Sequence, residues 1–270
     1  MPTSRRNEGS DLGARIAAAL PLIAFAILIV SQGGTVFAIG LIALGLMAFA
    51  ELFQMMRQPK PPVLAGYLAV IGLVLAARFG DRDQVLVVLA ISVPATFLLT
   101  VTRRHRKDSA WAMAVVFLGI VWIGMALAHT MLLRNLPHGG GLLVDTLLGT
   151  FLGDTGAYLG GRMWGRTKLS PRISPNKTVE GLVAGIAVGT LAFWLAGLYQ
   201  NWLNGVDALV IGAAVAFAAP IGDLFESLIK RDVGVKDAGS AFGPHGGVLD
   251  RLDAAFFTVV AAYYVALAVI

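Results

Sequence analysis

Acidic residues interrupt the apolar stretches near the C-terminal end of the chain. Asp223, Glu226 and Lys230 are spaced by three and four positions, so they share one face of a helix. Asp250 and Asp253 are again three positions apart, where the last apolar stretch begins. A carboxylate within a membrane helix is costly unless it faces water, a cation or a metal. Asp223, Asp250 and Asp253 are therefore predicted to hold Mg²⁺, which binds proteins through a few carboxylates together with substrate phosphates. An open alternative is that the acids form interfacial ion pairs with nearby cations, namely Arg231, Lys236 and Arg251.

A glycine-rich loop lies between these two groups of acids. It contains Gly239, Gly243, Gly246 and Gly247, with His245 among them. Glycine lets backbone N–H groups approach an anion closely, and a histidine can orient a phosphate or carry a proton. The alternative is that His245 only fixes the turn, and the residues alone do not decide between these roles.

A second polar block occupies residues 153–181. Asp154 interrupts another apolar run, and a series of cations follows it: Arg162, Arg166, Lys168 and Arg172. Ser174 and Pro175 are typical of the cap and the first residue of a helix. Such a helix start, with Lys177 beside it, would offer free N–H groups, a positive dipole end and a cation to a phosphate. An ordinary cap in a positively charged loop explains the same residues equally well.

The polar blocks belong to a chain that is more apolar than a soluble domain. Hydrophobic residues make up 57% of its 270 residues and charged residues 14%, whereas soluble domains are nearer half and a quarter. A helix needs about 20 apolar residues to cross a bilayer. Nine stretches meet this requirement: 13–31, 35–56, 62–80, 84–102, 110–133, 141–163, 178–200, 206–229 and 250–270. The sequence therefore predicts an all-α polytopic membrane protein with about nine transmembrane helices.

These helices are expected to form one membrane-embedded unit. Residues 1–140 would supply N-terminal transmembrane helices, and residues 141–270 the catalytic transmembrane region with its cytoplasmic loops. Glycines four positions apart in 141–163 and 178–200 predict close packing of those two helices. Pro220 removes a backbone hydrogen bond and predicts a local break in the helix that carries the first acids.

The positive charges predict how the helices cross the membrane. With the N-terminus in the cytoplasm, all 21 Lys and Arg residues except Arg78, Arg82 and Arg134 fall on the cytoplasmic side, as the positive-inside rule requires. Both polar blocks then face the cytoplasm, and the C-terminus lies outside. Topology thus accounts for the net charge of +5, and nucleic acid is not an expected partner. The first apolar stretch follows Arg5 and Arg6, but its small residues lie at the wrong end for signal cleavage, so a retained helix is expected.

Acids and cations gathered at one membrane face indicate phosphoryl or nucleotidyl transfer. The acids would hold a divalent metal, and the cations would neutralise a polyphosphate. A membrane transporter is a competing hypothesis, in which Asp154, Asp223 and Glu226 line an ion path. Transporters are often built from internal repeats with a site near the midplane, and this chain has neither feature, so an enzyme is favoured.

The polar residues of the C-terminal half also form a longer pattern. It runs Ser227-Leu-Ile-Lys230-Arg231, Lys236-Asp237, Gly239, Phe242, His245-Gly246-Gly247 and Asp250-Arg251-Leu252-Asp253. This pattern resembles the C-terminal signature of phosphatidate cytidylyltransferases. Asp154 to Tyr158 and Ser174 to Gly181 are similar to a second block of that family, although Asn176 replaces a lysine that is frequent there. The motifs cover roughly residues 155–253, and the first half resembles the family only as a membrane protein.

The resemblance implies a reaction and a set of roles. CTP and phosphatidic acid would give CDP-diacylglycerol and pyrophosphate with Mg²⁺, through in-line attack of a phosphatidate oxygen on the α-phosphorus. By position, the implied metal ligands are Asp223, Asp250 and Asp253, the implied phosphate or CTP contacts are Lys177, Lys230, Arg231, Lys236 and His245, and a further polar member is Asp154. The resemblance also implies a homodimer in membrane lipid, in bacteria at the inner membrane. The alternative enzyme is a CTP-dependent lipid-alcohol kinase, which would release CDP instead of pyrophosphate. The Asp-Gly-x-x-Ala-Arg element of CDP-alcohol phosphotransferases is not found.

Overall fold

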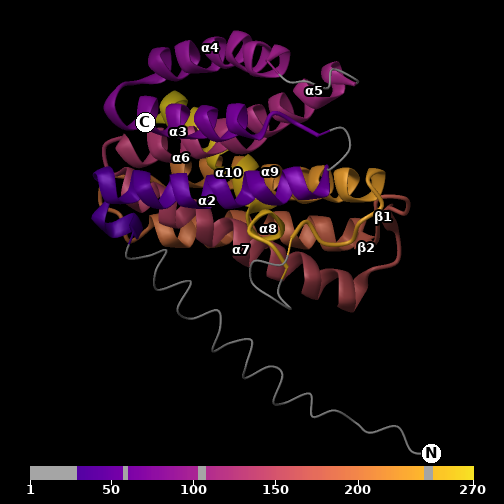
Figure 1. Cartoon of the computed structure of the whole chain (residues 1–270). Helices are drawn as coiled ribbons and strands as arrows, with labels where there is room; N and C mark the ends of the chain where they lie inside the picture. Colours follow the sequence, from indigo (N-terminus) through magenta and orange to yellow (C-terminus); the bar gives the residue numbers. More distant parts are fainter. Residues whose placement is uncertain (1–28, 57–59, 103–107, 240–245) are drawn as a thin grey trace, which may run out of the picture.

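The computed structural model describes residues 29–56, 60–102, 108–239 and 246–270. Helices fill most of this part of the chain, and together they form a layered bundle (Figure 1). They are α2 (Gly34–Met55), α3 (Val63–Phe79), α4 (Arg82–Val101), α5 (Ser109–Gly119), the π-helical turn η1 (Ile120–Gly124), α6 (Met125–Asn135), α7 (Gly139–Trp164), α8 (Val179–Gly197), α9 (Gly205–Asp232) and α10 (Leu249–Val269). The all-α architecture predicted from the apolar stretches is confirmed.

Six helical segments of the described chain are long and apolar enough to cross a membrane. They are Gly34–Met55, Arg82–Val101, Ser109–Asn135, Val179–Gly197, Gly205–Asp232 and Leu249–Val269. The apolar helix α3 is shorter, and α7, which contains Asp145, Asp154 and several glycines, is not among the six. The expected first span, 13–31, lies almost wholly outside the described residues. A polytopic membrane protein is therefore supported, while nine spans and the orientation of the termini stay predictions.

The bundle is arranged in layers that share one buried core. In Figure 1, α4 lies at one edge, α7 and α8 lie near the opposite edge, and α10 lies between them. Helix α10 packs against both α9 and α6, so it joins the two halves of the chain. The buried apolar side chains of both halves belong to a single cluster, from Phe49 and Leu73 in the first half to Phe193 and Tyr263 in the second.

Helices α7 and α8 approach each other closely because glycines face one another. A Cβ atom at Gly189 would lie 2.9 Å from the carbonyl oxygen of Gly149, and one at Gly185 would lie 3.0 Å from the carbonyl oxygen of Gly153. The packing predicted from glycine spacing is confirmed. The break predicted at Pro220 is wrong, because α9 continues through this residue. Helices α8 and α10 pack against α9, and neighbouring helices let a membrane helix tolerate a proline.

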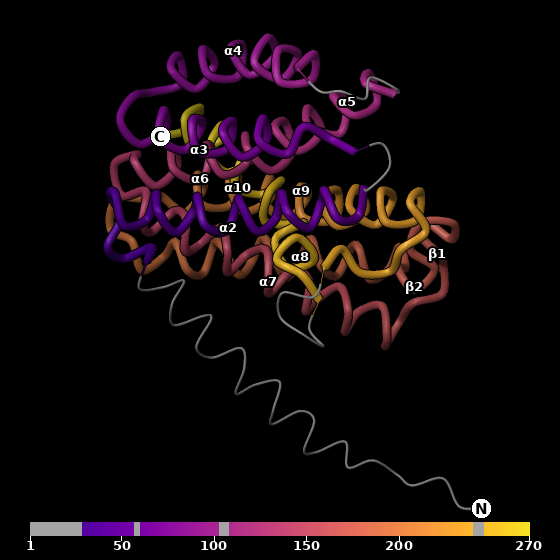
Figure 2. The backbone as a smooth tube through the Cα atoms, viewed as in Figure 1, coloured from indigo at the N-terminus to yellow at the C-terminus, as the bar shows by residue number. Residues whose placement is uncertain are grey.

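A short hairpin follows α7, at one end of the bundle (Figure 2). Strands β1 (Lys168–Ser170) and β2 (Ser174–Thr178) are antiparallel, with Lys168 opposite Thr178. The prediction that Ser174 and Pro175 begin a helix is therefore wrong. The N-cap is Thr178, whose hydroxyl accepts a hydrogen bond from Gly181 N at 3.1 Å. Both Ser174 and Thr178 are good capping residues, and the pairing of the strands decides between them.

This correction yields a direct prediction about stability. Thr178→Ala removes the cap of α8 and is expected to lower the free energy of unfolding by about 1 kcal/mol, or the thermal midpoint in detergent by roughly 2–4 °C. Ser174→Ala serves as the matched control and should change the midpoint less. A larger loss for Ser174→Ala than for Thr178→Ala would contradict the observed helix start.

Candidate active site

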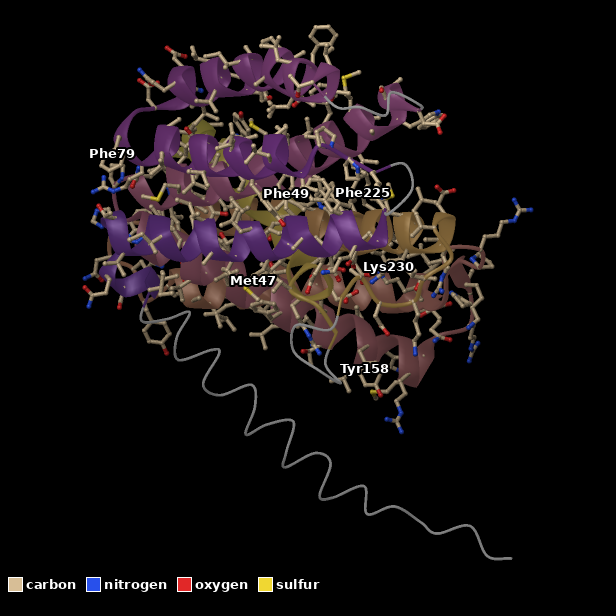
Figure 3. All side chains as sticks on the ribbon, viewed as in Figure 1. Met47, Phe49, Phe79, Tyr158, Phe225 and Lys230 are labelled. Carbon is tan, nitrogen blue, oxygen red and sulfur yellow. The ribbon has the colours of Figure 1, made fainter. Side chains whose placement is uncertain are left out.

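The predicted site residues meet at the hairpin end of the bundle. In Figure 3, Lys230 and Tyr158 lie toward this end, and Phe79 lies at the opposite end. A pocket of about 720 Å³ is walled by α7, α8, β2, α9 and α10. Its polar lining includes six of the predicted residues: Asp154, Lys177, Asp223, Lys230, Asp250 and Asp253. Acids from three helices therefore share one cavity.

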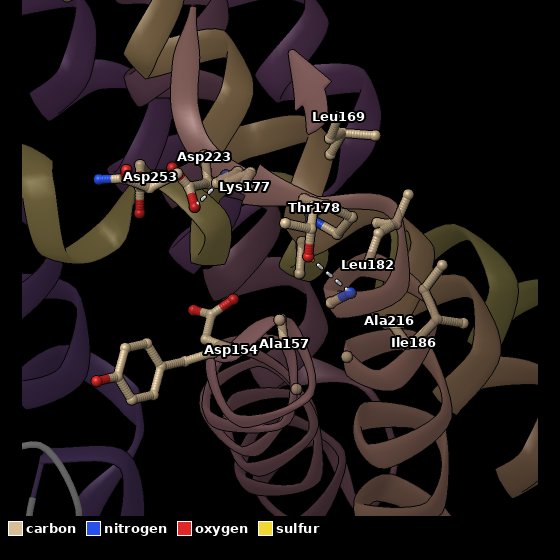
Figure 4. Close-up of a pocket in the computed structure, with 18 of the residues that line it drawn as sticks. Asp154, Ala157, Leu169, Lys177, Thr178, Leu182, Ile186, Ala216, Asp223 and Asp253 are labelled. Atoms are coloured by element: carbon tan, nitrogen blue, oxygen red, sulfur yellow. Dashed lines mark hydrogen bonds and ion pairs between the residues drawn. The ribbon is translucent and has the colours of Figure 1, made fainter. Parts of the chain in front are cut away.

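The outer wall of the pocket comes from α7 and the hairpin. Asp154 projects from α7 toward Lys177 and Asp223 (Figure 4), and its carboxyl interacts electrostatically with Asp223 and Asp253. Lys177 on β2 forms an ion pair with Asp223 on α9. The side chains of this pair are 26% and 35% exposed, so both remain accessible from the pocket.

Two further contacts hold the hairpin in place. Arg231 Nε, at the end of α9, donates to the carbonyl oxygen of Ile173 at 3.2 Å. The carboxylate of Glu180, in the first turn of α8, accepts from Arg166 N at 3.0 Å and from Thr167 N at 3.1 Å. The hairpin is thus anchored on both α8 and α9, which fixes the position of Lys177.

Lys230 is the central cation of the inner wall. Its Nζ atom lies 2.8 Å from Glu226 Oε2 and 2.8 Å from Asp250 Oδ1. Glu226 is fully buried, and its Oε1 atom has no hydrogen-bond partner among the described residues. The same carboxyl interacts electrostatically with Asp253. Glu226 is therefore a buried carboxylate next to the pocket residue Lys230, with one oxygen paired and the other without a hydrogen-bond partner in the described part of the chain.

Asp250 organises the loop that precedes α10. Besides Lys230, its oxygens accept from Ala238 N at 3.0 Å and from Gly247 N at 2.8 Å. Gly246 has a φ of 83°, a value that L side chains rarely adopt, and a Cβ atom there would lie 3.0 Å from Asp250 Oδ2. Asp253 differs, because among the described contacts one oxygen accepts from the neighbouring Ala254 N at 2.7 Å. Asp253 thus accepts fewer hydrogen bonds than Asp250, and its carboxyl also lies beside that of Glu226.

Two predicted contacts, Arg231 and Lys236, are not part of this pocket. Arg231 and Lys236 are exposed, and neither is among the described residues that line the cavity. His245 lies outside the described residues. Lys230 and Lys177 are therefore the predicted cations that the structure brings to the carboxylates.

Known proteins are similar to this chain over nearly its whole length. The model of the cytidylyltransferase family matches residues 13–269. A phosphatidate cytidylyltransferase of Staphylococcus aureus is 33% identical over 255 residues, which cover 90% of this chain and 94% of the relative. The chain belongs to the cytidylyltransferase family. The family match begins at residue 13, so the resemblance extends through the first half of the chain, well beyond the motifs.

Two further relatives are similar to this chain over different lengths. Phosphatidate cytidylyltransferase 4 of Arabidopsis thaliana, a chloroplastic protein, is 32% identical over 269 residues, covering 87% of this chain and 68% of the relative. The uncharacterized protein YnbB of Escherichia coli is 39% identical over 156 residues, covering 56% of this chain. The match spans only about half of YnbB, 52% of its length.

The structure brings into the pocket two residues that the sequence analysis named without assigning them to the site. Tyr158 and Arg162 line the outer wall, and Arg162 donates to the Tyr158 hydroxyl at 3.3 Å. Their spacing of four within α7 was the available signal. Glu226 was placed on the correct helix face, but its suggested role was limited to the ion path of the transporter alternative. Its complete burial beside Lys230 depends on the packing of α9 and α10, which helical spacing does not reveal.

The donor set fits a divalent metal supplied together with phosphates. Five carboxylates, from Asp154, Asp223, Glu226, Asp250 and Asp253, surround two lysines. This excess of negative charge, with an unpartnered oxygen on Glu226, favours a bound cation. In the described residues no three acidic, histidine or cysteine side chains form a ready-made metal cage. Mg²⁺ suits such a site because it commonly uses one or two carboxylates and completes its shell with water and phosphate.

Proposed function

We propose that this chain transfers the cytidylyl group of CTP to phosphatidic acid, giving CDP-diacylglycerol and pyrophosphate, with Mg²⁺ as cofactor. The proposal is supported by the pocket in which lysines and carboxylates from separate elements converge. It is also supported by relatives named phosphatidate cytidylyltransferase that match nearly the whole chain. Lys177 and Lys230 are the residues that neutralise the triphosphate of CTP.

The reaction needs charge neutralisation more than a general base. The monoester phosphate of phosphatidic acid has a second pKa of about 6, so its attacking oxygen is largely deprotonated at pH 7. The barrier then comes mainly from repulsion between two anions, and fixed positive groups lower it. Asp223, Asp250 and Asp253 are the acids that would hold the metal. Asp223 pairs with Lys177 and Asp250 with Lys230, so both lysines would lie beside the phosphates that the metal binds. The bound Mg²⁺ would supply further neutralisation of the phosphates.

The two substrates would approach from different parts of the pocket. Its deeper wall is built from small or apolar residues of α7, α8 and α9, including Gly149, Gly185, Ile186 and Ala216. This wall suits the diacylglycerol part of phosphatidic acid. The hairpin end carries exposed cations, among them Arg162, Arg166 and Lys168. By the positive-inside rule this end would face the cytoplasm, from which CTP would enter. In bacteria this corresponds to the inner membrane, and the homodimer implied by the family resemblance remains part of the proposal.

The reaction is tested with the full chain purified in detergent. CTP labelled in its base, phosphatidic acid and Mg²⁺ should give labelled lipid and one pyrophosphate per lipid formed, and chelation of Mg²⁺ should stop the reaction. Release of CDP together with phosphorylation of a lipid alcohol would instead identify a lipid-alcohol kinase. Omission of phosphatidic acid is the control for CTP hydrolysis.

Lys177 allows a separate test of how CTP binds. Lys177→Gln removes a pocket cation and is expected to raise the KM for CTP about tenfold, equivalent to about 1.4 kcal/mol of binding free energy. The KM for phosphatidic acid should change less. The matched control is Lys168→Gln, because Lys168 lies on the neighbouring strand but does not line the pocket. Equal effects of the two substitutions would show that Lys177 acts only through overall charge.

A further inference from the structure

A buried acid in the first half of the chain reaches the start of the last helix. Glu51 lies in α2 and is only 5% exposed. Its Oε1 atom accepts from Val248 N at 3.0 Å, and its Oε2 atom accepts from Leu249 N at 2.8 Å. The first N–H groups of a helix have no partner within the helix, and the positive dipole end favours a carboxylate. Glu51 thus satisfies the start of α10 from a distant part of the sequence.

Two glycines of the C-terminal pattern make room for this carboxylate. A Cβ atom at Gly239 would lie 2.5 Å from Glu51 Cδ, and one at Gly247 would lie 2.4 Å from Glu51 Oε2. Both distances are far below a normal contact, so a larger residue at either position would displace Glu51 or the loop. The carboxylate therefore occupies a fitted cradle formed by residues that flank the catalytic acids.

The same loop is bound from its other side by a pocket acid. Gly247 N donates to Asp250 Oδ2 at 2.8 Å, and the next two N–H groups along the chain donate to Glu51. Three consecutive N–H groups are thus held by two carboxylates from different helices. Glu51 itself is not among the described residues that line the pocket, so it acts on the site only through this loop.

We propose that Glu51 is a positioning residue for the transfer reaction. Its carboxylate fixes the loop at 246–249 and the first turn of α10, and thereby the direction in which Asp250 and Asp253 enter the pocket. This inference rests on the proposed function. It also gives the N-terminal half of the chain a defined task in catalysis, because α2 supplies an anchor that α7 to α10 do not provide.

The test compares Glu51→Gln with Glu51→Asp in the full chain. Glutamine has nearly the same shape but one acceptor oxygen, so its NH₂ group would face one of the two backbone N–H groups. We expect kcat to fall by about 10- to 100-fold in Glu51→Gln, because misplacement of a catalytic group by about 1 Å has effects of this size. The KM for CTP should change by less than about threefold, and Glu51→Asp, which keeps both acceptor oxygens, should retain more activity than Glu51→Gln.

A control variant separates positioning from loss of stability. Leu73→Ala truncates a fully buried side chain of α3 and is expected to lower the thermal midpoint while kcat stays near the wild-type value below that midpoint. Hydrogen exchange of a peptide that covers residues 246–253 should be faster in Glu51→Gln than in both the wild type and Leu73→Ala.

Four outcomes would overturn the proposal, and they are distinguishable. If Glu51→Gln keeps kcat within about twofold of the wild type, or if Leu73→Ala loses as much activity at matched stability, Glu51 does not position the site. If exchange at residues 246–253 is unchanged in Glu51→Gln, any loss of activity does not arise through the loop. If the wild type itself forms no CDP-diacylglycerol, the proposed function fails together with this inference, and the wild-type reaction alone reveals that case.

Discussion

Asp253→Asn is expected to lower kcat by about 10³-fold or more while the protein still folds and inserts into the membrane. Asparagine keeps the shape of the side chain and retains an oxygen that can accept from Ala254 N, as Asp253 does at 2.7 Å. What it removes is the negative charge opposite Asp223, which the proposed mechanism uses to hold Mg²⁺. The substitution therefore tests the negative charge of Asp253 while the shape and the hydrogen bond of the side chain are kept.

The measurement is turnover of labelled CTP by the purified variant across a range of Mg²⁺ concentrations. Asp253→Asn should also require more Mg²⁺ for half of its residual activity. Asp83→Asn is the matched control, because Asp83 is an exposed acid in the first turn of α4, away from the pocket, and its turnover should equal that of the wild type. Near-normal turnover of Asp253→Asn with an unchanged Mg²⁺ requirement would remove Asp253 from the metal site.

Lys230→Met is expected to reduce both stability and activity. Among the described residues, Lys230 is the cation that pairs with the fully buried Glu226, and it also binds Asp250 at 2.8 Å. Removal of one member of a buried ion pair leaves an uncompensated charge and costs about 3–5 kcal/mol. Because Lys230 also lines the pocket, its loss should lower kcat/KM for CTP by about 10²- to 10³-fold.

A double variant separates the two effects of Lys230. Lys230→Met combined with Glu226→Gln removes the uncompensated charge, so it should recover much of the lost thermal midpoint. Its activity should stay low, because the pocket still lacks a cation. Glu226→Gln alone keeps Lys230 and its contact with Asp250, and it serves as the reference for both measurements. Recovery of activity in the double variant would mean that Lys230 acts only through stability.

Local patterns in the sequence determined a large part of this protein. Apolar stretches of sufficient length predicted the helices, because a helix in lipid must satisfy its own backbone and cover itself with apolar side chains. Spacings of three and four placed Asp223 and Lys230 on one helix face, and Asp250 and Asp253 on one turn. The glycines of α7 and α8 predicted their close packing. Each of these predictions uses only the spacing of residues within one helix, so it requires no knowledge of the neighbouring helices.

Only the tertiary structure decided which groups become partners. The sequence placed Asp250 in the first turn of the last helix, and the structure adds that its oxygens accept from Lys230, Ala238 and Gly247. Its role as a metal ligand stays a prediction. Because residues 174–178 pair as a strand, the N-cap of α8 is Thr178 and not the predicted Ser174. Glu51 accepts a hydrogen bond from Val248 N, at the start of α10, although nearly two hundred residues separate them in the sequence. These contacts depend on how closely two distant backbones approach and on which polar groups remain unsatisfied there. The residue pattern of one segment does not show how closely a distant segment will approach. These contacts can therefore be identified only from the packed helices.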